Sequence, residues 1–442
     1  MSAELGRNRN HTHNRAIHST PPEVWSTIFR LAVGEHLCED QFTSSEGLRL
    51  AGGPDEKQWE AFRMSLVTRR YIIRVSKAWY EMASPLLNEY ILLRRGRSTF
   101  LLRDAMEASR RLSETNGGER PIGWWTKRLD VLMRDDGTTT DFDPYLVLDA
   151  VADIIACLPN LRILTFFVIG NGYAVKKIVA GLPSKVLCSL CCRESLKVVH
   201  WYNGILLPKV DDWTSFLQNH PYLESVHCDK WPDISPNTNL KLPSLKIVYP
   251  AYKYHHKSHY DFMHLELPAV RFAVYDKCNM DLLSQLGEQL TVLQIEKSVT
   301  ETYGPHDQAL FAEIREKCAN LLQVNLIGFL LPDISFPSTV RVLGLDIVNA
   351  MSGRGGARYA VIALPSILSQ NPNLKVVRLL SDLITSDLKF YPRMLIKVVK
   401  QMENSGVILL DHEDCPIRVH TISSSPDHHQ FHQSGMLQLS AE

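Results

Sequence analysis

The side chains best suited to do chemistry in this sequence are clustered thiols and imidazoles. Cys188 and Cys191 have the C-x-x-C spacing of half a zinc site, but no second pair of ligands follows, so small buried apolar residues are the better interpretation. A segment rich in tyrosine and lysine, without cysteine or carboxylate at ligand spacing, carries four histidines: His255, His256, His259 and His264. The sequence therefore predicts no metal site and no cofactor.

Common signatures of enzymatic sites are also missing. The sequence contains no G-x-x-x-x-G-K-[ST] phosphate loop, no H-E-x-x-H motif and no G-x-S-x-G nucleophile turn. The carboxylates of residues 135–143 lack the alternating ligands and closing glutamate of a calcium loop, so a solvated turn is expected. We expect a protein that is not an enzyme, and an enzyme with an unrecognised site is the least favoured hypothesis.

Composition narrows the partners and the compartment. The 442 residues have 45% hydrophobic and 22% charged residues, and Lys+Arg and Asp+Glu balance at 48 each. Because the net charge is zero, no overall electrostatic attraction to nucleic acid is expected. No apolar run approaches the roughly 20 residues that span a bilayer, so we expect neither nucleic acid nor a membrane as a partner. The N-terminus lacks an apolar signal region, and nine scattered cysteines are typical of reduced thiols. We expect a cytoplasmic and/or nuclear protein.

The elements that would position binding residues begin with a helix over 20–32, TPPEVWSTIFRLA. Thr20 is a good N-cap, Pro21 suits the first helical position, and Glu23 completes a capping-box pattern. Val24, Ile28 and further apolar residues then form a wide stripe. Serines, glycines and a proline predict an inserted loop over 33–65, after which helical periodicity returns up to about residue 90.

Beyond about residue 120, short apolar strands follow a leucine or valine in the recurring unit L-x-x-Φ-x-Φ. Successive anchors lie between 19 residues (Leu321 to Val340) and 35 residues (Leu161 to Leu196) apart, around the roughly 20 to 29 residues of a leucine-rich repeat. The anchors are Leu161, Leu196, Leu223, Leu245, Val270, Leu290, Leu321, Val340 and Leu374. Amphipathic helices, such as the one expected over 143–159, lie between the strands.

We therefore expect an α+β or α/β solenoid, in which a small N-terminal helical module precedes an irregular leucine-rich-repeat-like array with a curved parallel sheet. An ordinary α/β domain is the competing interpretation. The expected domains are a disordered N-terminus (1–17), the helical module (18–95) with its inserted loop (33–65), the repeat domain (96–420) and a flexible tail (421–442).

The paired segments 20–32 and 74–87 resemble an F-box, in the loop-interrupted form of F-box-like proteins from mushroom-forming (basidiomycete) fungi. The matches to the family's opening, I-F pair and V-x-K-x-W are Pro21, Glu23, Val24, Ile28, Phe29, Val75, Lys77 and Trp79. Thr20 replaces the usual leucine, and the inserted loop is longer than in a minimal F-box. The resemblance covers residues from about 18 to 415, including the irregular leucine-rich region.

The resemblance implies a non-catalytic substrate receptor of a cullin-RING (SCF-type) ubiquitin ligase. The F-box would bind the adaptor subunit, and the cullin through it, while the repeats would bind an unknown protein substrate. The implied adaptor-binding residues are Pro21, Glu23, Val24, Trp25, Ile28, Phe29, Val75 and Trp79. Each could instead be a core residue of the module, and a repeat scaffold that does not join a ligase is the alternative function.

Residues that alternate with buried strand positions would form the substrate face. The candidates are Thr165, His200, Tyr202, His227, Tyr249, Tyr275, Gln294 and Asn325. This set depends on strand register, since a slip of one residue exchanges the two faces of a strand.

Overall fold

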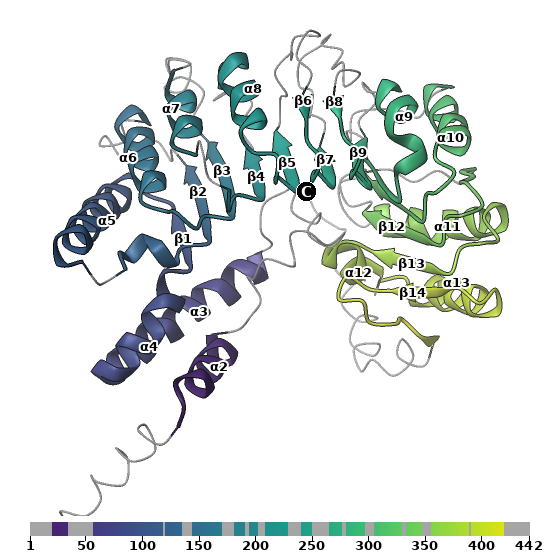
Figure 1. Cartoon of the computed structure of the whole chain (residues 1–442). Helices are drawn as coiled ribbons and strands as arrows, with labels where there is room; N and C mark the ends of the chain where they lie inside the picture. Colours follow the sequence, from purple (N-terminus) through teal and green to yellow (C-terminus); the bar gives the residue numbers. More distant parts are fainter. Residues whose placement is uncertain are drawn as a thin grey trace, which may run out of the picture. The chain divides into compact units, whose positions relative to one another are not determined.

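The computed structural model describes residues 20–33, 56–117, 120–134, 144–169, 181–190, 194–201, 208–228, 240–249, 265–275, 280–296, 305–328, 333–346, 355–388 and 390–419. These residues form an α/β fold with a long 12-stranded parallel sheet and 12 α-helices (Figure 1). The strand order is β1-β2-β3-β4-β5-β7-β9-β10-β11-β12-β13-β14. None of the helices described is long and apolar enough to cross a bilayer.

The chain divides into two compact units. The first comprises Met1–Leu245 with Glu266–Pro268, and the second comprises Lys246–Leu265 with Ala269–Glu442. The predicted α/β, solenoid-like architecture with a parallel sheet is confirmed at this level. The predicted domain boundary near residue 95 lies inside the first unit and stays a prediction.

The described part of the first unit begins with three helices, α2 (Pro22–Val33), α3 (Glu56–Val75) and α4 (Lys77–Asn88). They share a small core of their own, made of Phe29, Val33, Ile72, Ala83 and Leu86. Ser76 separates α3 from α4, and its hydroxyl accepts a hydrogen bond from the Trp79 backbone N–H at 3.1 Å as an N-cap. The shared core holds these helices against one another, and the cap marks the start of α4.

The predicted loop over 33–65 was wrong at its C-terminal end, because α3 already begins at Glu56. The glycines and the proline that indicated a loop end at Pro54. From Glu56 the sequence EKQWEAFRMSL contains neither glycine nor proline and is rich in good helix formers. The remainder of the predicted loop, residues 34–55, lies outside the described part of the chain.

The first unit continues as alternating strands and helices. They are β1 (Tyr90–Leu93), α5 (Gly96–Asn116), the 3₁₀ helix η3 (Ile122–Trp125), β2 (Arg128–Arg134), α6 (Pro144–Ala156), β3 (Ile163–Ile169), α7 (Gly181–Leu190), β4 (Val198–Trp201), α8 (Val210–Gln218) and β5 (Ser225–Cys228). Helices α5 to α8 lie in a row on one side of strands β1 to β5 (Figure 1). Short β6 (Leu240–Lys241) and β8 (Leu265–Glu266) form a separate two-stranded sheet.

The second unit is also built of strands and helices, but β12 follows β11 directly in the order of described elements, and two helices separate β13 from β14. Its elements are β7 (Ile247–Tyr249), β9 (Phe272–Tyr275), α9 (Met280–Leu286), the 3₁₀ helix η6 (Gly287–Gln289), β10 (Val292–Glu296), α10 (Pro305–Lys317), β11 (Gln323–Ile327), β12 (Val342–Asp346), α11 (Gly355–Gln370), β13 (Val376–Leu379), α12 (Asp382–Leu388), α13 (Pro392–Asn404) and β14 (Ile408–Leu410).

The nine anchor residues are all buried, each at most 2% exposed. At four of the nine anchors, the residue directly before the anchor also links successive repeats, because its side chain donates to a backbone carbonyl of the repeat before it. Four such bonds are Asn160 Nδ2 to Trp124 O (2.8 Å), Ser195 Oγ to Pro159 O (3.2 Å), Asn320 Nδ2 to Glu288 O (2.7 Å) and Asn373 Nδ2 to Ser338 O (3.0 Å). The recurring sequence unit is therefore also a recurring structural unit.

Candidate interaction surfaces

The first candidate surface is formed by α2 and α3. Among the residues expected to contact an adaptor, Phe29 is only 1% exposed and belongs to the core of the helical module. Trp25 and Trp79 are half-buried against it, with ring centroids 5.7 and 4.8 Å from that of Phe29. Phe29 is thus corrected to a core residue, because three aromatic rings at this spacing fill the space between the helices.

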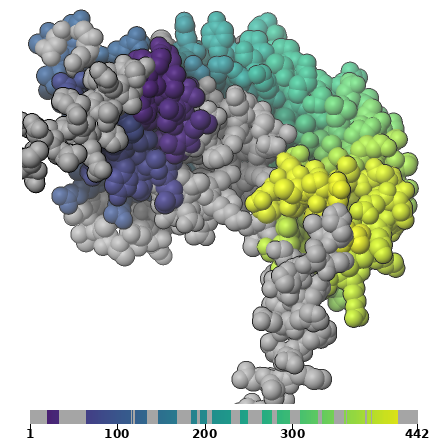
Figure 2. Space-filling model, turned by 90° about the horizontal axis from the view of Figure 1, so that it is seen from below, coloured from purple at the N-terminus to yellow at the C-terminus, as the bar shows by residue number. Residues whose placement is uncertain are grey.

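The other expected adaptor contacts are accessible. Pro21 and Glu23 are exposed, and Val24, Ile28 and Val75 are 45%, 43% and 58% exposed. The exposed side chains of Val24 and Ile28 lie on α2, which forms part of the surface in Figure 2 (purple). Val24 and Ile28 are four residues apart and therefore lie on the same side of α2.

The sequence reading missed most of the apolar stripe on α3. Met64, Val67, Tyr71 and Val75 are 61%, 42%, 68% and 58% exposed. Their spacing of three, four and four residues places them on one side of the helix. The helical spacing was a usable signal, but the predicted loop over 33–65 included Met64 and hid the start of the stripe.

A buried arginine holds α3 against α4. Arg69 is 6% exposed, and its Nη1 donates to the backbone carbonyl of Leu86 at 2.6 Å. This carbonyl belongs to α4, so the bond joins the two helices through a charge-assisted hydrogen bond. The relative position of α3 and α4, and with it the exposed stripe of α3, is therefore fixed by the module itself.

The second candidate surface is the sheet face of the first unit opposite its helices. Strand register aligns Asp130, Thr165, His200 and His227 in one row across β2 to β5. The neighbouring residues of β3, β4 and β5, Leu164, Val199 and Val226, are fully buried on the other face. The register predicted for Thr165, His200 and His227 is consistent with this alternation.

Burial limits what this row can contact. Thr165 and His200 are 7% and 3% exposed, and only His227 is half-buried. Neighbouring strands lie so close that side chains in one row pack against each other, which explains the burial. The prediction that these residues form a broad substrate face is therefore corrected. Among the described residues of this unit that were predicted for that face, His227 has an accessible side chain.

One end of the row is an ion pair within β2, and a hydrogen bond from Tyr90 joins it to β1. Arg128 donates from Nε to Oδ1 of Asp130 at 3.0 Å and from Nη2 to Oδ2 at 2.8 Å, and Tyr90 donates its phenol proton to the same carboxylate. Asp130 is 1% exposed, and the Arg128 Cζ lies 4.8 Å from the Tyr90 ring centroid. Burial and the carboxylate of Asp130 raise the pKa of Tyr90 well above its ordinary value, so the phenol keeps its proton.

His200 is a neutral member of the row. Burial lowers the pKa of His200 well below its ordinary value, and His227 and Arg128 lower it further. The His200 and His227 rings lie 6.2 Å apart between centroids. No group of three or more metal-ligating side chains occurs in the part of the chain that the structure describes. The row therefore contains one neutral imidazole, that of His200, beside His227 and in the same row as the ion-paired carboxylate of Asp130.

In the second unit, Gln294 and Asn325 are register partners on β10 and β11, as their predicted common face requires. They are 2% and 1% exposed, and each bonds within its own strand: Gln294 Nε2 to Glu296 Oε1 at 2.5 Å, and Gln323 Nε2 to Asn325 Oδ1 at 2.9 Å. Both amide side chains are buried and form hydrogen bonds inside the protein. Their prediction as substrate contacts was therefore wrong.

Three tyrosines complete the predicted face. Tyr275 is the register partner of Ile295 and is 1% exposed, so it lies on the face opposite Gln294 and its prediction was wrong by one residue of register. Tyr249 is the last residue of β7. Tyr202 lies outside the described residues, as does Cys191, whereas Cys188 is exposed on α7.

Comparisons with known proteins do not identify a function for these surfaces. The chain matches no family model and no curated protein. A crystal structure of a Bacteroides fragilis protein, solved as a Northeast Structural Genomics Consortium target, is similar over 69% of this chain and 69% of that chain, with 12% sequence identity and a TM-score of 0.27. A similarity at that level carries no argument about the fold or the function of this chain.

Proposed function

We propose that this protein is a non-catalytic substrate receptor of an SCF-type ubiquitin ligase, and that α2 and α3 bind the adaptor subunit. The observation that carries the proposal is the exposed apolar surface of these two helices. It comprises Val24, Ile28 and Leu31 on α2 and Met64, Val67, Tyr71 and Val75 on α3, each at least 42% exposed. A surface of this composition is typical of the apolar centre of a protein interface.

The module's own core leaves that surface available. Phe29 and Val33 of α2 and Ile72 of α3 are buried among the three helices, while the exposed residues take no part in that core. Of the eight residues that the F-box resemblance assigns to the adaptor, five are exposed: Pro21, Glu23, Val24, Ile28 and Val75. The exposure of these five residues supports the adaptor contact that the resemblance implies, whereas Trp25, Phe29 and Trp79 pack together inside the module.

In this proposal the strand and helix array presents the substrate, and the cullin joins through the adaptor. The resemblance supplies this role, and the tight packing of the array supports it because a rigid scaffold would hold a substrate at a defined position. Among the described members of the expected substrate face, His227 has an accessible side chain. We therefore assign the first substrate contact to the surface around β5.

The test is co-expression of the full chain with a fungal SCF adaptor, followed by size-exclusion chromatography and a measured Kd. We expect wild-type chain and adaptor to co-elute. Ile28→Asp and Tyr71→Asp should each weaken binding by about 30-fold or more, because each would place a charge in an apolar interface. Leu146→Asp on α6 is the matched control, since Leu146 is 58% exposed outside the module.

Circular dichroism of each variant separates loss of binding from loss of folding. Co-elution that persists in both folded α2 and α3 variants would move the adaptor site away from these helices. A wild-type chain that elutes without the adaptor would refute the receptor function and favour the alternative, a repeat scaffold that does not join a ligase.

A further inference from the structure

We propose that the outer face of α5 binds α5 of a second copy of this chain, so that the protein forms a weak, symmetric dimer. This inference concerns a different helix from the proposed adaptor site and does not depend on the ligase function. It rests on an exposed apolar stripe, on the palindromic spacing of that stripe, and on the charges beside it.

Helix α5 carries an apolar stripe that its own unit does not cover. Leu101 and Leu112 are 64% and 61% exposed, and Ala105 and Ala108 between them are also exposed. The four residues follow one another at intervals of four, three and four, which places them on one side of the helix. Its inward side is held by buried Met106 and Thr99.

The position of α5 in the fold makes this stripe unusual. Helix α5 packs chiefly against α6, η3 and β1, and in Figure 1 it is the end helix of the row α5 to α8. The end of a stacked array normally carries a polar outer face, because apolar residues there would promote association. An end helix with two exposed leucines is therefore suited to contact another protein.

The spacing of the stripe identifies a second copy as the partner. The order Leu-Ala-Ala-Leu at intervals of four, three and four reads the same in both directions. If two α5 helices pack antiparallel around a two-fold axis between Met106 and Glu107, Leu101 faces Leu112 of the second copy and Ala105 faces Ala108 of the second copy. The small alanines let the helix axes approach, and the leucines close both ends of the contact, as a self-complementary interface requires.

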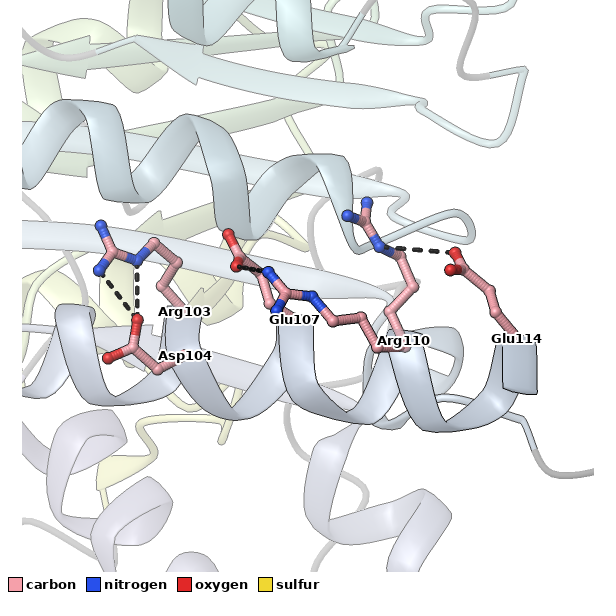
Figure 3. Close-up of polar contacts among 6 residues, drawn as sticks. Arg103, Asp104, Glu107, Arg110 and Glu114 are labelled. Carbon is pink, nitrogen blue, oxygen red and sulfur yellow. Dashed lines mark hydrogen bonds and ion pairs between the residues drawn. The ribbon is translucent and has the colours of Figure 1, made fainter. Parts of the chain in front are cut away.

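The charges beside the stripe favour the same arrangement. Asp104 and Arg111 flank the stripe on one side, and the antiparallel arrangement places Asp104 near Arg111 of the second copy, twice by symmetry. Within one chain these side chains form exposed pairs, Arg103–Asp104 at 2.8 Å and Glu107–Arg111 at 3.3 Å, which run along the helix with Arg110–Glu114 (Figure 3). Such exposed pairs are weak and can exchange partners at little cost.

The size of the contact predicts its strength. Two single helices that meet along one stripe bury less than the roughly 1,200 Å² of total area that marks a standard interface. We therefore expect an equilibrium between monomer and dimer that responds to protein concentration.

The test is sedimentation velocity of the full chain from the low micromolar range to several hundred micromolar. Wild-type protein should shift from monomer to dimer, and Leu101→Lys/Leu112→Lys should weaken the dimer by about 100-fold or more, because four lysines would meet at the contact. The matched control is Leu146→Lys/Ile362→Lys, which changes two leucine- or isoleucine-sized side chains that are 58% and 55% exposed on other helices. The control should dimerise as the wild type does.

Charge reversal tests the antiparallel geometry itself. Asp104→Arg and Arg111→Asp should each weaken the dimer by about threefold to tenfold, and the double variant should regain the wild-type affinity, because the exchanged charges still meet across the axis. A wild-type chain that stays monomeric, or a dimer that no α5 variant weakens, would overturn the proposal. Adaptor binding should be equal in all α5 variants, so failure of this proposal and failure of the ligase function are distinguishable.

Discussion

His200 shows how burial changes the chemistry of a residue that the sequence offers as a contact. Its side chain lies in the row of Asp130, Thr165 and His227 and is 3% exposed. Because burial lowers its pKa, the ring is neutral in the folded protein, and the ionisable groups that lower the pKa further are His227 on β5 and Arg128 on β2. The sequence can indicate that a histidine alternates with apolar residues, but its exposure depends on neighbouring strands.

The lowered pKa of His200 makes stability depend on pH in a defined direction. Above about pH 6.5 the ring is neutral in both the folded and the unfolded chain, and below that value the unfolded chain binds a proton that the folded chain excludes. The free energy of unfolding should therefore fall as the pH falls from about 7.5 to 5.5. In urea titrations, His200→Gln should show a smaller fall than the wild type, and Thr165→Val, a non-titrating change in the same row, should keep the wild-type fall. Equal pH dependence of wild type and His200→Gln would contradict a neutral buried ring.

At the scale of elements, a recurring glycine contact shows how successive repeats pack. Gly123 in η3 and Gly287 in η6 each lie five residues before a strand, β2 and β10. A Cβ at either glycine would overlap a backbone carbonyl at the end of the next helix, that of Cys157 directly after α6 or that of Lys317, the last residue of α10. Each glycine thus lets a 3₁₀ helix approach the chain of the following repeat.

Gly123→Ala should lower the free energy of unfolding by about 1–3 kcal/mol, because the clash is with backbone, which a change of rotamer does not relieve. The neighbouring substitution Ile122→Ala changes a side chain that is 37% exposed and should cost less than about 1 kcal/mol. Chemical denaturation of both variants checks this order. A Gly123→Ala chain as stable as Ile122→Ala would mean that η3 moves away from Cys157 at little cost.

The elements also show what a sequence can and cannot predict. The nine anchors and the strands after them were predictable, because an apolar residue followed by alternating apolar positions is a local signal. The start of α3 at Glu56 was missed because glycines and a proline just before it dominated the interpretation of the segment. The wrong face of Tyr275 and the burial of Gln294 and Asn325 depend on strand register and on contacts between strands, neither of which a local pattern contains.

At the scale of the whole molecule, the structure consists of units in which each repeat is joined mainly to its neighbours. In the second unit, the buried side chain of Asn371 connects neighbouring repeats and is 7% exposed. Its Oδ1 accepts a hydrogen bond from the Phe336 backbone N–H at 2.7 Å, and its Nδ2 donates to Ile334 O at 2.7 Å and to Ile367 O at 2.8 Å. In a linear array of repeats, losing the contacts between two repeats destabilises those two repeats most.

Asn371→Ala should therefore destabilise the chain locally. Removing the amide leaves the buried Phe336 N–H and the Ile334 carbonyl without that partner, at a cost of about 2–4 kcal/mol. Hydrogen exchange measured by mass spectrometry should show faster exchange in β11, β12 and β13, with unchanged exchange in β2, β3 and β4. Asn373→Ala is the control, because Asn373 is exposed and donates one bond, to Ser338 O at 3.0 Å, so only about 0.5–1.5 kcal/mol should be lost. Exchange that rises equally in β2 and in β12 would mean that the two units unfold as one cooperative body. The view that stability is a sum of contacts between neighbouring repeats would then be wrong.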